Sequence, residues 1–487
     1  MFTSTFLGIF STGFWFFLVE FVLRLGMILF LLLQKKKRPS VLLAWILLIL
    51  AFPIIGLLAY PMFGGTRLGR RRMNRHRMIL DQIDKPEFHL WNDPRPHQIE
   101  LNESEQQLSR LAETVSRSPA SSGNRLKLFG CTDEVIKQLV MDIDVATDHV
   151  HMCFYIYLDD MAGTRVGQAL ERAVQRGVDC RLLVDGAGSK AFLRSRLRRR
   201  LVDSGIQGIA AMPVNWLRLL FSRIDLRNHR KIVVIDGKLG WTGSQNIAEA
   251  SFAPKKKYAP WVDCMVRADG PVVRELQLIF TEDWYLDSTD DLDEQIKIAP
   301  TWHEDGIPAQ VMATGPNFYN EATTQIIQAS IQLARHEVFL TTPYFVPDEG
   351  TFMSIIVAAR RGVDVQIVMP SRNDSKLVGA ASRSFYQPML KAGVRIHEYT
   401  KGLLHAKTIT IDKDLAVVTS ANLDRRSFSL NFEAGLLVYD TDFASQLRFL
   451  QGSYVEDSIP VNKDEWMKRS WARRLGENTA GILSPLL

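Results

Sequence analysis

Two long apolar runs open the chain. Residues 10–33 are interrupted only by Glu20 and Arg24, and residues 41–60 contain no charge. About twenty apolar residues are needed for an α-helix to cross a ~30 Å hydrocarbon core. Glu20 and Arg24 lie four positions apart, so they share a helix face and can pair. The pattern predicts a transmembrane helical hairpin in residues 1–63. It disfavours a buried hairpin of a soluble domain and a cleaved signal peptide.

After a polar stretch the pattern changes to short β-rich runs that alternate with amphipathic helical runs, which indicates an α/β sandwich. The predicted strands include residues 180–184, 231–235, 365–369 and 408–411, and the predicted helices include 166–176 and 351–361. We divide the chain into the hairpin, a basic juxtamembrane segment and linker (64–122), a first α/β repeat (123–290), a linker (291–312) and a second repeat with an apolar tail (313–487).

The two halves contain one motif twice. Residues 228–246 read NHRKIVVIDGKLGWTGSQN and residues 404–422 read LHAKTITIDKDLAVVTSAN. Five identities share one offset of 176, a coincidence expected by chance on the order of 10⁻⁶ per placement or less. The paired residues are His229 and His405, Lys231 and Lys407, Asp236 and Asp412, Ser244 and Ser420, and Asn246 and Asn422.

These residue types suit a double displacement at phosphorus. Residues two apart in a strand share a face, so each histidine and its lysine point the same way. One histidine can attack covalently while the other donates and later accepts a proton. The lysines, with the serines and asparagines as donors, can neutralise phosphoryl oxygens. Asp236 lies an odd number of positions from His229 and faces away, which indicates an orienting role. No cluster has metal-ligand spacing, so we expect no metal.

The arrangement HxK(x)4D(x)6GSxN resembles the phospholipase D superfamily from about Leu126 to the C-terminus. The resemblance implies two α/β sandwich repeats related by pseudo-twofold symmetry and a phosphohistidine intermediate, with His229 preferred as the nucleophile over His405. It also implies an acid downstream of each motif that orients the histidine, Asp263 for the first motif and Glu433 for the second. The second motif departs from the pattern, because Thr419 replaces the usual glycine.

Charge is distributed unevenly. The chain has a net charge of +6, but the first 77 residues carry +10 and the remainder −4. The basic flank suits anionic headgroups, at about 1 kcal/mol per residue near the surface, and leans slightly toward a cytoplasmic body. The acidic body argues against a polyanion such as DNA. We interpret the four cysteines (Cys131, Cys153, Cys180 and Cys264) as buried, reduced thiols.

Several stretches look like bacterial cardiolipin synthases: the two apolar N-terminal segments, TPYFVP at 342–347, NLDRRS at 422–427 and SPLL at 484–487. That resemblance implies transfer of a phosphatidyl group between two phosphatidylglycerol molecules, releasing glycerol, without a cofactor. It also implies a multi-pass protein of the bacterial cytoplasmic (inner) membrane. The expected partners are phosphatidylglycerol and anionic membrane lipid rather than nucleic acid, and a homo-oligomer is left open.

Other functions remain alternatives. The same motif would serve a membrane-bound phospholipase D hydrolase or a related phosphatidyltransferase, and a membrane-tethered nuclease is the third choice. A scaffold with a degenerate site is disfavoured because both His-Lys pairs are retained. Residues 214–221 are either an interfacial segment that admits acyl chains or a core helix. Five arginines either hold anionic lipid or form a solvated helix face: Arg194, Arg196, Arg198, Arg199 and Arg200.

Overall fold

The computed structural model describes residues 2–33, 39–65, 68–83, 95–213, 223, 225–288, 292–316, 319 and 321–482. The chain forms two compact units, each of which is described by itself. The first comprises residues 1–69 and 214–225, and the second comprises residues 70–213 and 226–487. The loop at 35–38, the segment at 214–221 and the SPLL tail lie outside the described residues.

The described part of the first unit contains three apolar helices: α1 (Phe2–Leu32), α2 (Pro39–Ala51) and α3 (Pro53–Phe63). Residues 14–32 of α1 are long and apolar enough to cross a membrane, and Glu20 pairs with Arg24 as predicted. The predicted second span is wrong as one continuous helix. Pro53 begins a new helix after Phe52, because proline cannot donate the backbone hydrogen bond that a continuous helix needs. Trp45 of α2 packs edge-on against Tyr60 of α3, with ring centroids 5.2 Å apart.

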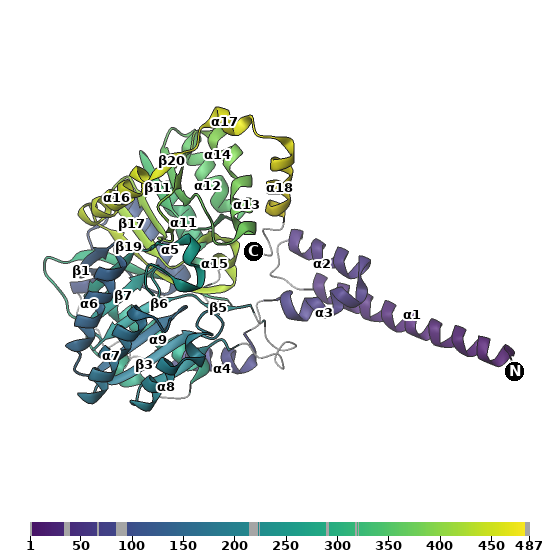
Figure 1. Cartoon of the computed structure of the whole chain (residues 1–487), viewed down its shortest axis with the longest axis horizontal. Coiled ribbons are helices and arrows are strands. Elements are labelled where there is room, and N and C mark those ends of the chain that lie inside the picture. Colours follow the sequence, from purple (N-terminus) through teal and green to yellow (C-terminus); the bar gives the residue numbers. More distant parts are fainter. Residues whose placement is uncertain are drawn as a thin grey trace. The chain divides into compact units, whose positions relative to one another are not determined.

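The second unit is built on one 16-stranded sheet (Figure 1). Its strand order is β20-β14-β13-β11-β16-β17-β19-β10-β1-β9-β7-β6-β2-β3-β4, with β5 paired to β19. The order reads symmetrically outward from the antiparallel β1–β10 pair, so β9, β7, β6, β2, β3 and β4 correspond to β19, β17, β16, β11, β13 and β14. The predicted pair of α/β repeats with pseudo-twofold symmetry is therefore confirmed.

The strands of the first repeat are β1 (Ser121–Phe129), β2 (His149–Phe154), β3 (Asp179–Asp185), β4 (Gln207–Ala211), β5 (Arg227–Asn228), β6 (Lys231–Ile235), β7 (Leu239–Gly243), β8 (Trp261–Val262) and β9 (Met265–Asp269). Those of the second are β10 (Ile307–Thr314), β11 (Glu337–Thr341), β12 (Phe345–Val346), β13 (Asp364–Pro370), β14 (Arg395–Tyr399), β15 (Leu403–Leu404), β16 (Thr408–Ile411), β17 (Leu415–Thr419), β18 (Leu423–Asp424), β19 (Asn431–Tyr439) and β20 (Ser458–Pro460). All four predicted strands lie within β3, β6, β13 and β16.

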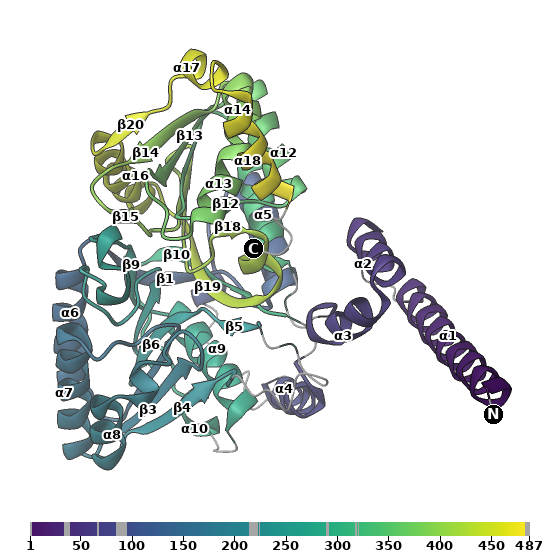
Figure 2. The same cartoon turned by 45° about the vertical axis from the view of Figure 1, so that its right-hand side comes forward.

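Helices cover both faces of the sheet (Figure 2). One apolar core lies beneath α9 (Val272–Asp287) and α16 (Thr441–Glu456) and includes residues of both repeats, so the repeats share a single interior. On the other face the first repeat carries α6 (Thr132–Asp144), α7 (Met161–Gln175) and α8 (Arg196–Asp203). The second repeat carries α11 (Ala322–Leu333), α12 (Glu349–Arg360) and α14 (Tyr386–Ala392) there. The two motifs are therefore supported by one continuous core.

Part of the predicted linker belongs to the second unit. Helix α4 (Arg70–Ile83) packs on α9, where the Arg72 guanidinium donates to the Asp287 carboxylate at 2.6 Å and Arg75 donates to the Leu286 carbonyl. The expectation that these arginines face lipid is therefore wrong for Arg72. The predicted linker helix is α5 (Glu103–Ser116), which begins at an Asn102 capping box. Three cysteines are buried as predicted, but Cys131 is exposed.

Candidate active site

Each motif enters the site by pairing with the opposite repeat. Strand β5, immediately before His229, runs parallel to the start of β19, and β15, immediately before His405, runs parallel to β8. The backbone N–H of His229 donates to the Phe432 carbonyl at 2.9 Å, and that of His405 donates to the Val262 carbonyl at 2.7 Å. Each histidine is therefore fixed by a strand of the other repeat.

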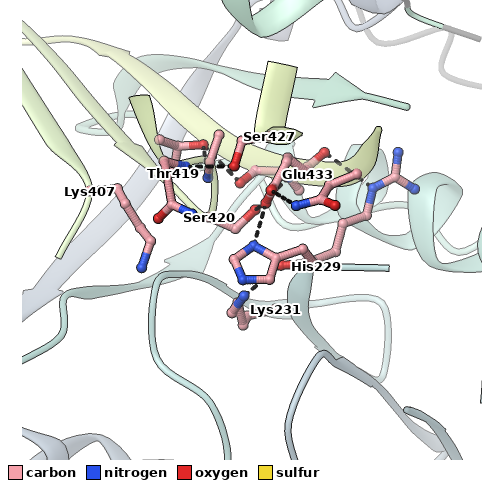
Figure 3. Close-up of polar contacts among 12 residues, drawn as sticks. His229, Lys231, Lys407, Thr419, Ser420, Ser427 and Glu433 are labelled. Carbon is pink, nitrogen blue, oxygen red and sulfur yellow. Dashed lines mark hydrogen bonds and ion pairs between the residues drawn. The ribbon is translucent and has the colours of Figure 1, made fainter. Parts of the chain in front are cut away.

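The orienting acids consequently cross between the repeats. His229 Nδ1 lies 2.8 Å from Glu433 Oε2 (Figure 3), and His405 Nδ1 lies 2.6 Å from Asp263 Oδ1. All four side chains are buried. The prediction correctly picked both acids, but assigning each to the histidine of its own motif is wrong. Asp263 and Glu433 occupy equivalent places despite their different spacing from the motifs.

The motif serines hold these acids. Ser420 Oγ donates to Glu433 Oε2 at 2.6 Å and accepts the Ala434 N–H, while Ser244 Oγ donates to Asp263 Oδ1 at 2.6 Å and accepts the Cys264 N–H. A hydroxyl has one proton to donate, and here the carboxylate takes it. Phosphate binding by Ser244 and Ser420 stays a prediction, whereas their contacts with the acids are shown. They position the acids.

The motif asparagines lie beside the site. The Asn246 carboxamide accepts the Ile156 N–H at 3.0 Å, which leaves its NH₂ group as a donor. The Asn422 backbone N–H donates to Ser427 Oγ, and its side-chain oxygen has no hydrogen-bond partner among the described residues. Phosphate binding by these two asparagines stays a prediction.

Thr419 replaces a glycine without disturbing the second motif. In the first motif Gly243 has φ +148°, and a Cβ there would lie 2.4 Å from the Cys264 carbonyl oxygen. Gly243 faces Met265 across β7 and β9, whereas Thr419 faces Gly435 across β17 and β19. A Cβ on Gly435 would lie 2.7 Å from that of Thr419. The glycine has therefore moved to the opposite strand, and the close approach of the two strands is preserved.

Two buried lysines supply the positive charge. Lys231 Nζ donates to the His229 carbonyl at 2.6 Å and Lys407 Nζ to the His405 carbonyl at 2.5 Å, leaving two protons on each ammonium for other acceptors. Burial lowers the pKa of Lys231 to about 8 and that of Lys407 to about 7, although Glu433 and Asp263 oppose the shift. The charge of each lysine also lowers the pKa of His229 and of His405, because a second positive charge beside it is unfavourable.

The histidines are held neutral. Burial lowers the pKa of His229 to about 4, against the opposing effect of Glu433, and it lowers the pKa of His405 as well. Burial alone would raise the pKa of Asp263, but His405 and Lys407 outweigh it and hold the value at about 2. An ionised acid beside a neutral imidazole assigns the proton to Nδ1, so the lone pair is on Nε2. Aromatic rings flank both imidazoles, Tyr155 at His229 and Trp261 at His405, each with centroids 4.7 Å apart.

The comparisons with known proteins agree with this geometry. The family described as "Cardiolipin synthase, PLD-like domain" matches residues 139–284 and 327–449, which contain both motifs and both acids. Cardiolipin synthase A of Edwardsiella ictaluri is 36% identical over 479 residues, covering 98% of this chain and 97% of that protein. The chain belongs to the cardiolipin synthase family. Cardiolipin synthase A of Yersinia pseudotuberculosis is likewise 36% identical, with the same coverage of both chains.

Among solved structures, the phosphatidylserine synthase of Haemophilus influenzae superposes with a TM-score of 0.60 at 15% identity, covering 78% of this chain and 98% of that one. At this identity the likeness concerns the fold alone. Together with the family match, it confirms that the paired repeats of this cardiolipin synthase family member form a phospholipase D-like body.

Asp236 and Asp412, also predicted for the site, lie at the far ends of strands β6 and β16. Six residues of largely extended chain lie between His229 and Asp236, which places the two about 20 Å apart. The Asp236 carboxylate accepts the backbone N–H groups of Thr147, Asp148 and His149 at 2.8–3.0 Å. Asp412 does the same for residues 335–337. The orienting role predicted for Asp236 is wrong, and so is the predicted place of Asp412 in the site: these aspartates cap the loops that precede β2 and β11.

One buried charge network was missed by the sequence analysis. Arg230 is 1% exposed, and its guanidinium donates to Asp283 at 2.5 Å and to the backbone carbonyls of Glu433 and Thr314. The Asn228 carboxamide donates to the same Asp283 carboxylate at 2.8 Å. The repeat could not reveal this network, because the second motif has leucine and alanine at the equivalent positions. No group of three or more metal-ligating side chains occurs in the part of the chain that the structure describes.

Proposed function

We propose that the chain is a membrane-bound phosphatidyltransferase that converts two phosphatidylglycerol molecules into cardiolipin and glycerol. The observation that carries the proposal is the pair of crossed His–carboxylate contacts, each beside a buried lysine, in a member of the cardiolipin synthase family. Two histidines with free Nε2 atoms provide a nucleophile and a separate acid–base group, which transfer to an alcohol acceptor requires.

In the first step His229 Nε2 attacks the phosphorus of one phosphatidylglycerol, and the bond from phosphorus to the glycerol headgroup oxygen breaks. Lys231 and Lys407 neutralise the phosphoryl oxygens. The anionic phosphate raises the pKa of His405 on binding, which loads its Nε2 with the proton that the departing glycerol oxygen receives. The product is free glycerol and a phosphatidyl group on His229.

In the second step His405, now neutral, removes the proton from the terminal hydroxyl of a second phosphatidylglycerol. That oxygen attacks the phosphorus, and the bond to His229 breaks to give cardiolipin. One phosphodiester replaces another, so the exchange needs no external energy source. Glu433 and Asp263 keep their charges throughout and stabilise the imidazolium forms through Nδ1.

We choose His229 as the nucleophile because Arg230 of its own motif holds the backbone of Glu433, whereas the second motif has Ala406 at that position; burial also lowers the pKa of His229 to about 4, so its Nε2 is unprotonated at neutral pH. The 2.6 Å contact with Asp263 suits His405 to the acid–base role, since a close carboxylate stabilises the imidazolium. We further propose that α1 anchors the chain in the bacterial cytoplasmic membrane and that the second unit is cytoplasmic. A second membrane crossing would need both α2 and α3 in succession, because each of them alone is shorter than a membrane span.

The test uses the purified full-length chain in vesicles that contain phosphatidylglycerol labelled in its headgroup. Cardiolipin and free labelled glycerol in equal amounts are expected, with no product from the His229→Ala variant. The matched control is His303→Asn, which replaces a histidine that pairs with Asp269 outside the site and should leave the rate unchanged. Phosphatidic acid as the main product would instead identify a hydrolase, and cleavage of short DNA at a comparable rate would identify a nuclease.

A further inference from the structure

The last described helix, α18 (Trp471–Ile482), has an apolar stripe that faces solvent. Trp471 is 72% exposed, Leu475 58% and Ile482 77%. At 100° per residue these three side chains fall within an arc of about 40° on the helix surface. These side chains, with the polar Asn478 on the same face, form a small exposed patch of the kind that often marks an interaction site.

The opposite face of α18 is firmly attached to the catalytic unit. Ala480 is buried in a small core with Val346 and Ala381, and Glu477 accepts hydrogen bonds from Arg469 at 2.6 Å. Gly481 lies so close to α13 (Lys376–Ser384) that a Cβ would be 2.7 Å from Ser384 Oγ. The stripe is therefore not a packing face left open by a loose helix. It faces outward because the opposite face of α18 packs on the catalytic unit.

The elements beneath α18 connect it with the second motif. Helix α13 packs on β12, and β12 pairs in parallel with β18, which begins directly after Asn422. Figures 1 and 2 show α18 on the same side of the second repeat as α13, whereas α16 lies on the opposite side. A molecule that binds the stripe is thus connected to the site through two layers of structure.

The basic residues near the stripe indicate an anionic partner. Residues 468–482 contain four basic residues and one acid, Glu477, which is buried. Arg474, the residue before Leu475, and Lys468, three residues before the start of α18, are both exposed. Tryptophan and aliphatic side chains between basic residues suit the boundary between headgroups and acyl chains of an anionic bilayer. Three side chains expose a few hundred Å² at most, well below the ~800 Å² per partner that a stable protein dimer buries.

We propose that α18 is a membrane-docking helix that inserts Trp471, Leu475 and Ile482 into the surface of an anionic bilayer. Lys468 and Arg474 contact the lipid phosphates. The five residues after α18 add three leucines to the sequence and lie outside the described residues. Docking would hold the catalytic unit at the bilayer independently of α1. This inference goes beyond the proposed reaction, since it holds for any enzyme that uses a substrate in the bilayer.

The experiment places an environment-sensitive fluorophore on the full-length chain. In a Cys131→Ser background the three remaining cysteines are buried, so Leu475→Cys can be labelled selectively. The matched control is Phe449→Cys on α16, which is 84% exposed on the opposite side of the repeat. Both proteins are reconstituted in vesicles of phosphatidylserine or phosphatidylcholine that carry a spin-labelled quencher lipid, and folding is checked by thermal melting.

We expect quenching and a blue shift for the label at 475 in phosphatidylserine vesicles, a weaker response in phosphatidylcholine, and none for the label at 449. Replacing Lys468 and Arg474 with Gln should remove the difference between the two lipids. Equal responses at 475 and 449 would overturn the proposal. So would a response that disappears when the protein is diluted in excess lipid, because that result identifies a second copy of the chain as the partner. Neither readout depends on the reaction, so a failure of the proposed synthase activity would be recognised separately.

Discussion

Replacing Glu433 with Gln tests the crossed arrangement of the site directly. The Glu433 carboxylate accepts three hydrogen bonds, from His229 Nδ1 and Ser420 Oγ at Oε2 and from Asn431 Nδ2 at Oε1. A glutamine offers one oxygen and one NH₂ group in the same space. Whichever way the amide turns, at least one of the three donors then faces another donor, and the negative charge beside His229 is lost.

The size of the effect follows from the buried charge. In the proposed reaction His229 becomes positively charged when it carries the phosphatidyl group, and the Glu433 carboxylate lies 2.8 Å from its Nδ1. Opposite charges about 4 Å apart interact by about 4 kcal/mol at an effective dielectric constant of 20. A loss of that size raises the barrier enough to slow the reaction about 10³-fold, at roughly 1.4 kcal/mol per factor of ten. The change should lower kcat and leave KM for the lipid nearly unchanged.

The rate of cardiolipin formation from labelled phosphatidylglycerol measures kcat, and Glu398→Gln serves as the control, since Glu398 lies on β14 outside the site. A second readout is the rate at which diethylpyrocarbonate modifies each histidine, followed by peptide mass spectrometry. Glu433→Gln should alter the modification of His229 and leave His405 unchanged. A loss smaller than tenfold, or a change at His405 instead, would refute the reasoning.

Three other predictions follow from named contacts. Asp236→Ala leaves three backbone N–H groups without an acceptor and should lower the free energy of unfolding by about 1–3 kcal/mol in urea titrations. The kcat of the folded protein should not change, and a large fall in kcat would support an orienting role for Asp236 after all. Because burial lowers the pKa of Lys407 to about 7 and of Lys231 to about 8, their charged forms persist below these values and are lost above them. kcat/KM should therefore fall as pH rises through 7–8, and a profile flat to pH 10 would contradict this. Arg230→Met leaves Asp283 buried without its cation and should cost about 3–5 kcal/mol of stability in thermal melts, which a second change, Asp283→Leu, should partly restore; unchanged melting would argue against the network.

The fold and the two His-Lys pairs could be predicted because their signals are local. The period of a strand places His229 and Lys231 on one face, and the offset of 176 indicates that the same unit occurs twice. The strand period also predicted that Asp236 faces away from His229. Its partners could not be predicted, since the loop that it caps lies 87–89 residues earlier in the chain.

The crossing of the acids could not be predicted either. It depends on two-residue strands, β5 and β15, that pair with segments of the other repeat, and strands so short have no periodicity to detect. The unequal spacing of Asp263 and Glu433 from their motifs was no obstacle, because neither acid serves its own motif. The break in the second apolar run was visible in principle, since Pro53 is a typical first residue of a helix.

The two repeats are equivalent in their reacting groups and unequal in what supports them. Both histidines have a buried acid, a serine behind the acid and a lysine two residues on. An arginine directly after the histidine occurs in the first motif only. The guanidinium of this Arg230 donates to the Glu433 backbone carbonyl and to the Asp283 carboxylate. The backbone of Glu433, the acid that contacts His229, is thus held by Arg230 of the same motif as His229. Ala406, at the equivalent position of the second motif, cannot hold Asp263 in this way. A nucleophile must hold its direction toward phosphorus through both steps, whereas an acid–base group must follow first the leaving and then the entering oxygen. The asymmetric support therefore favours His229 as the nucleophile on geometric grounds that are independent of its pKa.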